Sequence, residues 1–146
     1  MDKLSVTSPV FKNGEAMPKK HSQNDENVNP PLDIAGTPAE TKTLTLIVTD
    51  LDIPFGLTIT HWVMWNIPPT SHIEENSAPG IQGKNSRRKK AYMGPRPPLG
   101  THRYLFEIYA LDTELKLDSD ASRKDVEKAM QNHILAKGEL LGTYHK

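Results

Sequence analysis

Residues 59–67 read ITHWVMWNI, and they carry apolar side chains on both faces of an extended chain. β-Branched and aromatic residues favour strands, and a strand that is apolar on both faces is typical of the middle of a covered sheet. Strict alternation puts one set of side chains, Ile59, His61, Val63, Trp65 and Ile67, on one face and a second set, Trp62 and Met64, on the other. We therefore expect a central strand over 59–67.

Two more strands are predicted on either side of this one along the chain. Residues 43–50 alternate between aliphatic and threonine or isoleucine side chains and end at Asp50. Residues 102–111, HRYLFEIYAL, place five side chains on one face, namely His102, Tyr104, Phe106, Ile108 and Ala110. The intervening residues 68–101 are predicted to be a long loop region, of the kind that is often functional.

Near the C-terminus the pattern predicts a helix. Ser122 followed by Asp125 is a capping-box signal, and Gly138 can end the helix. The positions that recur at helical spacing are Val126, Ala129, Met130, His133, Ile134 and Lys137. On this interpretation His133 belongs to the core, and residues 139–144 return as a short strand.

Composition limits the class of protein. The 146 residues fit one domain over 1–146, and 12 prolines with 9 glycines favour many turns over a helical bundle. Residues 1–40 are rich in Asn, Pro and Gly, but their spaced aliphatic residues predict an ordered segment that wraps the core. There is no cysteine, no signal-like segment and no run of about 20 apolar residues, so we expect a cytoplasmic protein without an integral membrane segment. A net charge of zero argues against nucleic acid as a partner.

Polar residues lie beside the predicted strands. Asp50 and Asp52 follow the first strand, His61 lies in the second, and His102 and Tyr104 open the third. If they meet in one pocket, imidazole and phenol groups could hold an anion. Alternatively, the aspartates cap a turn and the histidines are satisfied core residues, and the pattern alone leaves both interpretations open.

Residues 92–104, YMGPRPPLGTHRY, add a stiff loop in which Gly94 can let backbone approach a ligand. This segment resembles, together with TDLDIPFG at 49–56 and THWVMWNIP at 60–68, the two signature regions of phosphatidylethanolamine-binding proteins, also called Raf kinase inhibitor proteins. Three further segments, at 26–34, 108–117 and 133–144, resemble the bacterial and archaeal YbhB/YbcL branch of that family.

The resemblance implies a mainly β, antiparallel β-sandwich-like fold with one or more short helices near the C-terminus, and a small pocket for phosphate or phosphoryl headgroups. It assigns to the pocket Asp50, Asp52, His61, Gly94, Arg96, Pro97, His102 and Tyr104. In this assignment Asp52 supports the others and Trp62 packs nearby. The resemblance also implies a cis bond before Pro54.

Three departures from the family pattern stand out. Leu51 replaces the first proline of the DPDxP pattern, and residues 84–90 are unusually basic. Arg96 lies where relatives carry a small residue or cysteine. Its guanidinium could grip phosphate or could pair with Asp50 and plug the pocket, and we favour the first. The basic run is interpreted as a solvated surface, with acidic lipid headgroups or an acidic partner as the alternative.

The first functional hypothesis is a non-enzymatic anion-binding module with a regulatory role. The second, from the resemblance, is an inhibitor of a serine protease or kinase that acts through residues 77–96. The third is an enzyme on a small phosphorylated substrate, which the absence of cysteine and of a G-x-S-x-G elbow disfavours. We expect no metal and no cofactor, since the spacing matches no metal motif, and a homodimer remains an open expectation.

Overall fold

The computed structural model describes residues 2–146, and within that range the strands form two sheets. The larger sheet contains β1 (Asp2–Lys3), β3 (Glu15–Ala16), β5 (Thr43–Asp50), β6 (Ile59–Ile67), β8 (Ile81–Gln82), β9 (Thr101–Leu111) and β10 (Ile134–His145). The smaller sheet contains β2 (Ser5–Thr7), β4 (Leu32–Ala35) and β7 (His72–Ile73). The helical segments are η1 (Lys19–His21), η2 (Pro54–Gly56) and α1 (Arg123–Met130).

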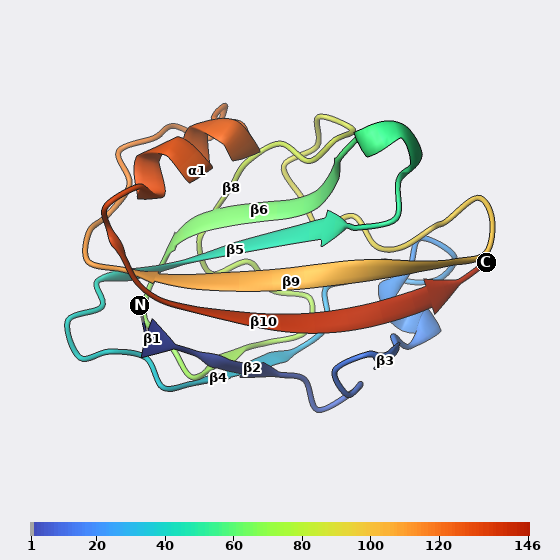
Figure 1. Ribbon diagram of the computed structural model, residues 1–146, viewed down its shortest axis with the longest axis horizontal. Coiled ribbons are helices and arrows are strands. Elements are labelled where there is room, and N and C mark those ends of the chain that lie inside the picture. Colours follow the sequence, from blue (N-terminus) through green and yellow to red (C-terminus); the bar gives the residue numbers. More distant parts are fainter. Residues whose placement is uncertain (1) are drawn as a thin grey trace.

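The long strands of the larger sheet run antiparallel in the order β10-β9-β5-β6, with β8 beyond β6 (Figure 1). Two short N-terminal strands, β1 and β3, pair in parallel with β10 and cover parts of its edge. The three strands predicted from the sequence are β5, β6 and β9, so the predicted mainly β fold with one short helix in the C-terminal region is confirmed.

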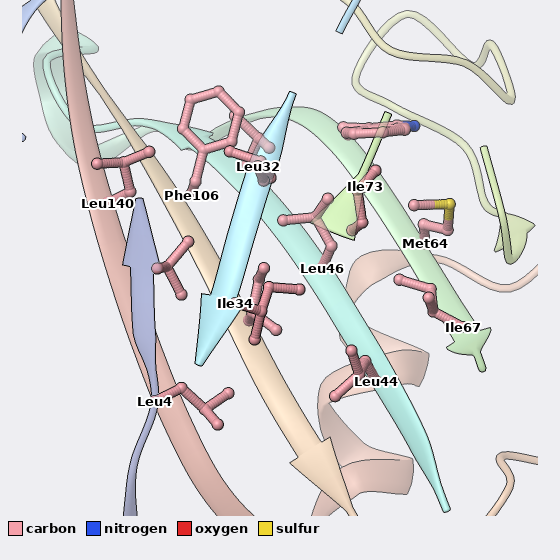
Figure 2. Close-up of a cluster of buried hydrophobic side chains, with 14 of the residues drawn as sticks. Leu4, Leu32, Ile34, Leu44, Leu46, Met64, Ile67, Ile73, Phe106 and Leu140 are labelled. Atoms are coloured by element: carbon pink, nitrogen blue, oxygen red, sulfur yellow. The ribbon is translucent and has the colours of Figure 1, made fainter. Parts of the chain in front are cut away.

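The main core lies between the two sheets (Figure 2). Figure 2 shows side chains of the larger sheet meeting those of the smaller one, among them Leu44, Leu46, Met64, Phe106 and Leu140 against Leu32, Ile34 and Ile73. Burial of such side chains supplies most of the driving force for folding. All eight residues of β5 are buried, because this central strand is covered on both faces.

Helix α1 covers the opposite face of the larger sheet. Its Val126 and Met130 are buried against a second cluster that includes Ile47, Val63 and Trp65. The predicted capping box at its start is confirmed: the Ser122 hydroxyl accepts from the backbone of the third helical residue, and that residue's carboxylate accepts from the Ser122 N–H.

The predicted helix is too long at its C-terminal end. Helix α1 ends at Met130, and Asn132 takes a left-handed conformation with φ 68°. Residues 134–145 then form β10, which pairs with β9 along its whole length. The hydrogen bonds and packing that these residues gain beside the buried strand β9 stabilise them as a strand more than their apolar spacing favours a helix. His133 is consequently not a core residue, and its Nδ1 lies 2.8 Å from Oδ1 of Asp112 at the surface.

The predicted alternation in β6 is wrong at Ile67. Asn66 has φ 54°, and one extra β6 residue stands between the pairs Leu44–Ile67 and Leu46–Met64. This bulge shifts Ile67 by one position, so it lies in the main core with Met64 and not with Val63.

The N-terminal segment wraps the core as predicted, with Leu4, Val6 and Phe11 buried. Val10, by contrast, is largely exposed. Among residues 2–146, no helix has the length and apolar character needed to cross a membrane.

Candidate functional site

Three strands of the larger sheet meet at the candidate site. Asp50 ends β5 and pairs in register with Tyr104 of β9. On the other side of β5, Val48 pairs with Trp62 and Thr49 pairs with Thr60, which leaves His61 as an extra residue. A bulge of this kind redirects side chains locally.

The bulge brings His61 against β9. The rings of His61 and Tyr104 meet edge to face with centroids 5.1 Å apart, and the His102 ring stacks on Tyr104 with centroids 6.5 Å apart. Strict alternation had grouped His61 with Val63 and Trp65, but its ring instead contacts a tyrosine of the main core. The expected convergence of two imidazoles, a phenol and a carboxylate is therefore present.

Asp50 is buried and both of its oxygens are engaged. Oδ1 accepts a hydrogen bond from the Asp52 N–H at 2.8 Å, and Oδ2 lies 2.7 Å from Nδ1 of His102. Asp52 itself faces away, where it accepts from the backbone and guanidinium of Arg103. The Arg103 guanidinium lowers the pKa of Asp52 below its usual range. Asp52 thus holds the turn, as expected for a supporting residue.

A cavity of about 300 Å³ opens beside this cluster. Its lining consists of Gln23, Asp50, Ile53, Ile59, His61, Ser86, Arg87, Met93, Arg96, Pro97, Pro98 and Tyr104. Five predicted site residues are in this set, namely Asp50, His61, Arg96, Pro97 and Tyr104. His102 stands behind Asp50, and neither Asp52 nor Gly94 lines the cavity.

Gly94 has a packing role. A side chain there would overlap the carbonyl oxygen of His21, and its N–H donates to Oδ1 of Asn27 at 2.7 Å. The Gln23 side-chain amide donates to the Gly94 carbonyl at 2.9 Å. The glycine therefore lets the N-terminal segment dock against the loop before β9, and does not itself approach a ligand.

The contacts through which the N-terminal segment supports the candidate site were not predicted from the sequence. His21, which carried no recognisable signal, is buried, and its Nδ1 lies 2.8 Å from the carbonyl oxygen of Val28. The Tyr92 hydroxyl donates to the His21 carbonyl, and Trp62 packs edge to face on Tyr92. Trp62 therefore packs one layer behind the cavity. Only the long-range contact between residues 20–29 and 91–94 reveals this arrangement.

The expected cis bond before Pro54 is absent. The Ile53–Pro54 bond is trans, like every other peptide bond that the structure describes. Pro54 is the first residue of η2, a position that a trans proline favours because its φ suits a helical turn.

Burial sets the protonation of two cavity groups. It lowers the pKa of His61, although the Met93 carbonyl and the charge of Asp50 oppose the change. The Met93 oxygen lies 2.7 Å from Nδ1, and a carbonyl can only accept, so Nδ1 carries the proton of the neutral ring. Burial, followed by the charge of Asp50, raises the pKa of Tyr104, which keeps this phenol protonated at neutral pH.

The Tyr104 hydroxyl is buried and has no hydrogen-bond partner within residues 2–146. The Asp50 carboxylate lies nearby and accepts from the Asp52 N–H and from His102, with each of its oxygens engaged once. Buried polar atoms are nearly always paired in folded proteins, and this hydroxyl belongs to a residue that lines the cavity.

Two arginines line the cavity. Arg96 and Arg87 are both exposed, and neither forms an ion pair in the described part of the chain. The alternative in which Arg96 plugs the pocket by pairing with Asp50 is therefore not the arrangement observed. Arg87 was not singled out, since nothing in a run of five basic residues distinguishes the one that reaches a cavity.

The same arrangement of strands occurs in known proteins. The family model described as phosphatidylethanolamine-binding protein matches residues 7–145. The chain belongs to this family. A UPF0098 protein of Pyrococcus horikoshii is 43% identical over 157 residues, which cover 99% of this chain and 79% of the relative. A second one, from Pyrococcus abyssi, is 42% identical over 156 residues, which cover 99% of this chain and 87% of the relative.

Two solved structures of the phosphatidylethanolamine-binding protein family are similar over their whole length. A homologue from Chlamydia trachomatis superposes with a TM-score of 0.94 at 36% identity, covering 100% of this chain and 99% of the other. YbcL of Escherichia coli gives a TM-score of 0.89 at 27% identity, covering 99% of each chain. The predicted resemblance to the YbcL branch is therefore confirmed.

In this member of the family, Leu51 stands where the pattern has proline. Its N–H donates to the Arg103 carbonyl at 2.8 Å, a bond that proline could not make. The substitution therefore ties the turn after β5 to β9 and leaves Asp50 and Asp52 in place.

Proposed function

We propose that this chain is a binding module for a phosphate-type oxyanion, held in the cavity by Tyr104, His61, Arg87 and Arg96. The buried, unpaired hydroxyl of Tyr104 carries the proposal, because it is a protonated donor that the fold leaves without an acceptor. An oxyanion supplies acceptor oxygens for several donors at once.

The charges at the cavity wall favour an anionic ligand that still carries an ionisable proton. The guanidinium groups of Arg87 and Arg96 offset the charge of the Asp50 carboxylate, which lies at the cavity wall. Neutral His61 keeps its proton on Nδ1, and its Nε2 forms no hydrogen bond to the described residues, so Nε2 can accept from a protonated ligand oxygen. A phosphate monoester or hydrogen phosphate provides both acceptors and such a proton.

Binding is favoured over catalysis for a structural reason. Within residues 2–146 no serine or threonine hydroxyl bonds to His61 or His102, so neither imidazole is paired with a side-chain nucleophile. The Ser86 hydroxyl at the cavity wall accepts from the Thr60 N–H and belongs to the loop structure. A regulatory role for the module, in which the occupied cavity is what a partner recognises, is consistent with these features.

The proposal is tested by titrating the protein with inorganic phosphate and with phosphoethanolamine while recording the NMR signals of the histidine side chains. We expect the signals of the His61 ring to shift as the anion binds, because Nε2 gains a hydrogen bond from the ligand, and those of the surface ring of His133 to stay unchanged. His61→Gln should weaken binding, and the matched surface variant His133→Gln should not. Folded protein whose His61 ring ignores both compounds at millimolar concentration would contradict the proposal.

A further inference from the structure

Asn13 and Gly14 form an exposed turn that contains a reactive pair of groups. The Glu15 N–H closes this turn on the Lys12 carbonyl at 2.9 Å, and Gly14 has φ 85°. Because glycine has no side chain, its backbone nitrogen can approach the side-chain amide of a preceding asparagine closely. An asparagine that is followed by glycine is therefore especially prone to lose its side-chain nitrogen as ammonia. The sequence contains one such pair, at 13–14.

Strand β10 holds this turn through a single residue. The Leu141 N–H donates to Oδ1 of Asn13 at 2.8 Å, and the Gly14 N–H donates to the Leu141 carbonyl at 2.7 Å. Loss of the amide group requires the Gly14 nitrogen to give up its proton and the Asn13 side chain to turn toward that nitrogen. Both hydrogen bonds oppose these changes, since each holds one of the two reacting groups in place. The turn is therefore protected while it is docked on β10.

The docked turn lies between two buried side chains that anchor it. Phe11 and Met17 are buried, and a side chain at Gly142 of β10 would overlap both of them. Between these anchors lies β3, whose two residues pair with residues 142–143 near the end of β10 (Figure 1). Segments with few buried side chains and short pairings open at a lower free energy than the whole fold. Residues 11–17 can therefore separate from β10 while the long strands stay paired.

We propose that Asn13 is a site of spontaneous deamidation, that opening of residues 11–17 controls its rate, and that one product keeps these residues open. In the opened segment the deprotonated Gly14 nitrogen attacks Cγ of Asn13. The new N–C bond closes a succinimide ring, and the side-chain nitrogen takes up a proton and leaves as ammonia. Water then adds to one ring carbonyl and breaks the bond from that carbonyl to the ring nitrogen, which is protonated again. Addition at Cγ gives aspartate, and addition at the main-chain carbonyl gives isoaspartate.

The two products differ in how they fit β10. Aspartate leaves the main chain unchanged, and its carboxylate accepts from the Leu141 N–H as the amide oxygen does. Isoaspartate carries the main chain through its side-chain carbon, which adds one methylene before Gly14, so the turn no longer matches the two bonding groups of Leu141. The edge of β10 at residues 141–143 then stays unpaired, and such an edge favours association between copies of a chain.

This inference does not depend on the proposed function. Residues 11–17, all of which the structure describes, contribute nothing to the lining of the anion cavity.

The first test is peptide mapping by mass spectrometry of the full chain kept at about pH 8.5, once folded and once in about 8 M urea. We expect the folded chain to convert Asn13 about tenfold more slowly than the unfolded chain, or more slowly still, because conversion waits for opening. In urea both aspartate and isoaspartate should form at position 13. Equal rates in the two conditions, or no conversion in urea, would overturn the inference.

A pair of core variants shows whether the opening is local. Met17→Ala removes one anchor and should raise the conversion rate in the folded chain about tenfold. The matched control is Val126→Ala, which removes a fully buried side chain from the separate cluster under α1 and should leave the rate near that of the wild type. Phe11→Leu, a milder change of the other anchor, takes the place of Met17→Ala if that variant does not fold. Equal acceleration by Val126→Ala would show that residues 11–17 open only with the whole fold, and would overturn the inference.

Amide hydrogen exchange tests the effect of the product. The N–H groups of Gly14, Met17 and Leu141 bond across the docked contact, so they should be protected in the wild type. They should stay protected in Asn13→Asp and should exchange at least about tenfold faster in the isoaspartate form, isolated by chromatography. Full protection in the isoaspartate form would show that residues 11–17 dock again, and would contradict the proposed effect of the product.

Discussion

Two buried tyrosines on β9 are five residues apart and face opposite sides of the sheet, and their surroundings differ in one respect. The Tyr109 hydroxyl donates to Glu107 at 3.1 Å, and Nζ of Lys137 lies 2.9 Å from the same carboxylate. The Tyr104 hydroxyl has no partner, and Asp50 beside it is bonded elsewhere. A paired cluster stabilises the fold, whereas an unpaired donor at a cavity wall is available to a ligand.

Burial acts on both phenols in the same direction. It raises the pKa of Tyr109 to about 12, with a further contribution from the charge of Glu107. It raises that of Tyr104 as well, with Asp50 as the neighbouring charge. Both hydroxyls are therefore donors at neutral pH. What distinguishes them is the acceptor, which is a side chain of the protein at Tyr109 and is missing at Tyr104.

The largest effect is expected when the paired cluster is broken. Glu107→Ala should lower the free energy of unfolding by about 2–3 kcal/mol, because Lys137 and the Tyr109 hydroxyl lose a buried acceptor. Urea denaturation measures this loss. Phosphate affinity of the folded variant should be unchanged, and a parallel loss of affinity would show that the two clusters are not independent.

Tyr104→Phe should have the opposite effect, with phosphate affinity reduced and stability retained. Removing an unpaired buried hydroxyl should leave stability unchanged or raise it by up to about 1 kcal/mol. Phosphate affinity should fall about tenfold, since a donor to an anion is lost. Calorimetric titration with phosphate, paired with urea denaturation, checks both. Unchanged affinity would remove Tyr104 from the site.

Tyr109→Phe is the matched control for that variant. It removes the same atom from a paired position, so it should lower the free energy of unfolding by about 1 kcal/mol and leave phosphate affinity as in the wild type. The same denaturation and titration experiments apply. A loss of affinity equal to that of Tyr104→Phe would mean that the titration reports general destabilisation.

The smallest effect concerns pH. The pKa of His61 is lower in the folded chain than its ordinary value near 6.5, so the unfolded chain binds more protons between the two values. His61 should therefore reduce stability as pH falls through about 6.5, with a slope of at most ~1.4 kcal/mol per pH unit. The free energy of unfolding of wild type and of His61→Gln, measured by urea denaturation across about pH 5 to 8, should differ in its pH dependence. That difference separates the contribution of His61 from those of the other histidines.

Sulfate sharpens the pH experiment, because its charge is constant over that range. An anion next to His61 should raise the pKa of the ring, so sulfate should stabilise the wild type more strongly as the pH falls. His61→Gln should show a nearly constant stabilisation by sulfate. A pH-independent effect in the wild type would indicate that His61 does not contact the anion.

Much of the fold followed from local patterns. Residues 43–50, 59–67 and 102–111 are long, strongly apolar and rich in β-formers, and they became β5, β6 and β9 within one residue of the expected bounds. The capping box at Ser122 could be predicted equally well, because it depends on two side chains that are three residues apart in the sequence. The C-terminal end of α1 could not be predicted in this way. The spacing of residues 133–137 suits a helix, and only the long pairing with β9 makes residues 134–137 part of a strand.

Some features of the candidate site also followed from the sequence, and others depended on the tertiary structure. The sequence singled out Asp50, His61, His102 and Tyr104 as candidates, because polar groups in or beside apolar strands are costly, and the family resemblance favoured a pocket over satisfied core residues. Only the tertiary structure decided that a bulge turns His61 toward Tyr104, that Arg87 reaches the cavity, and that Gly94 serves the N-terminal segment. Each of these depends on contacts between residues far apart along the chain, and no local periodicity encodes which atoms will meet or which donor will be left without a partner.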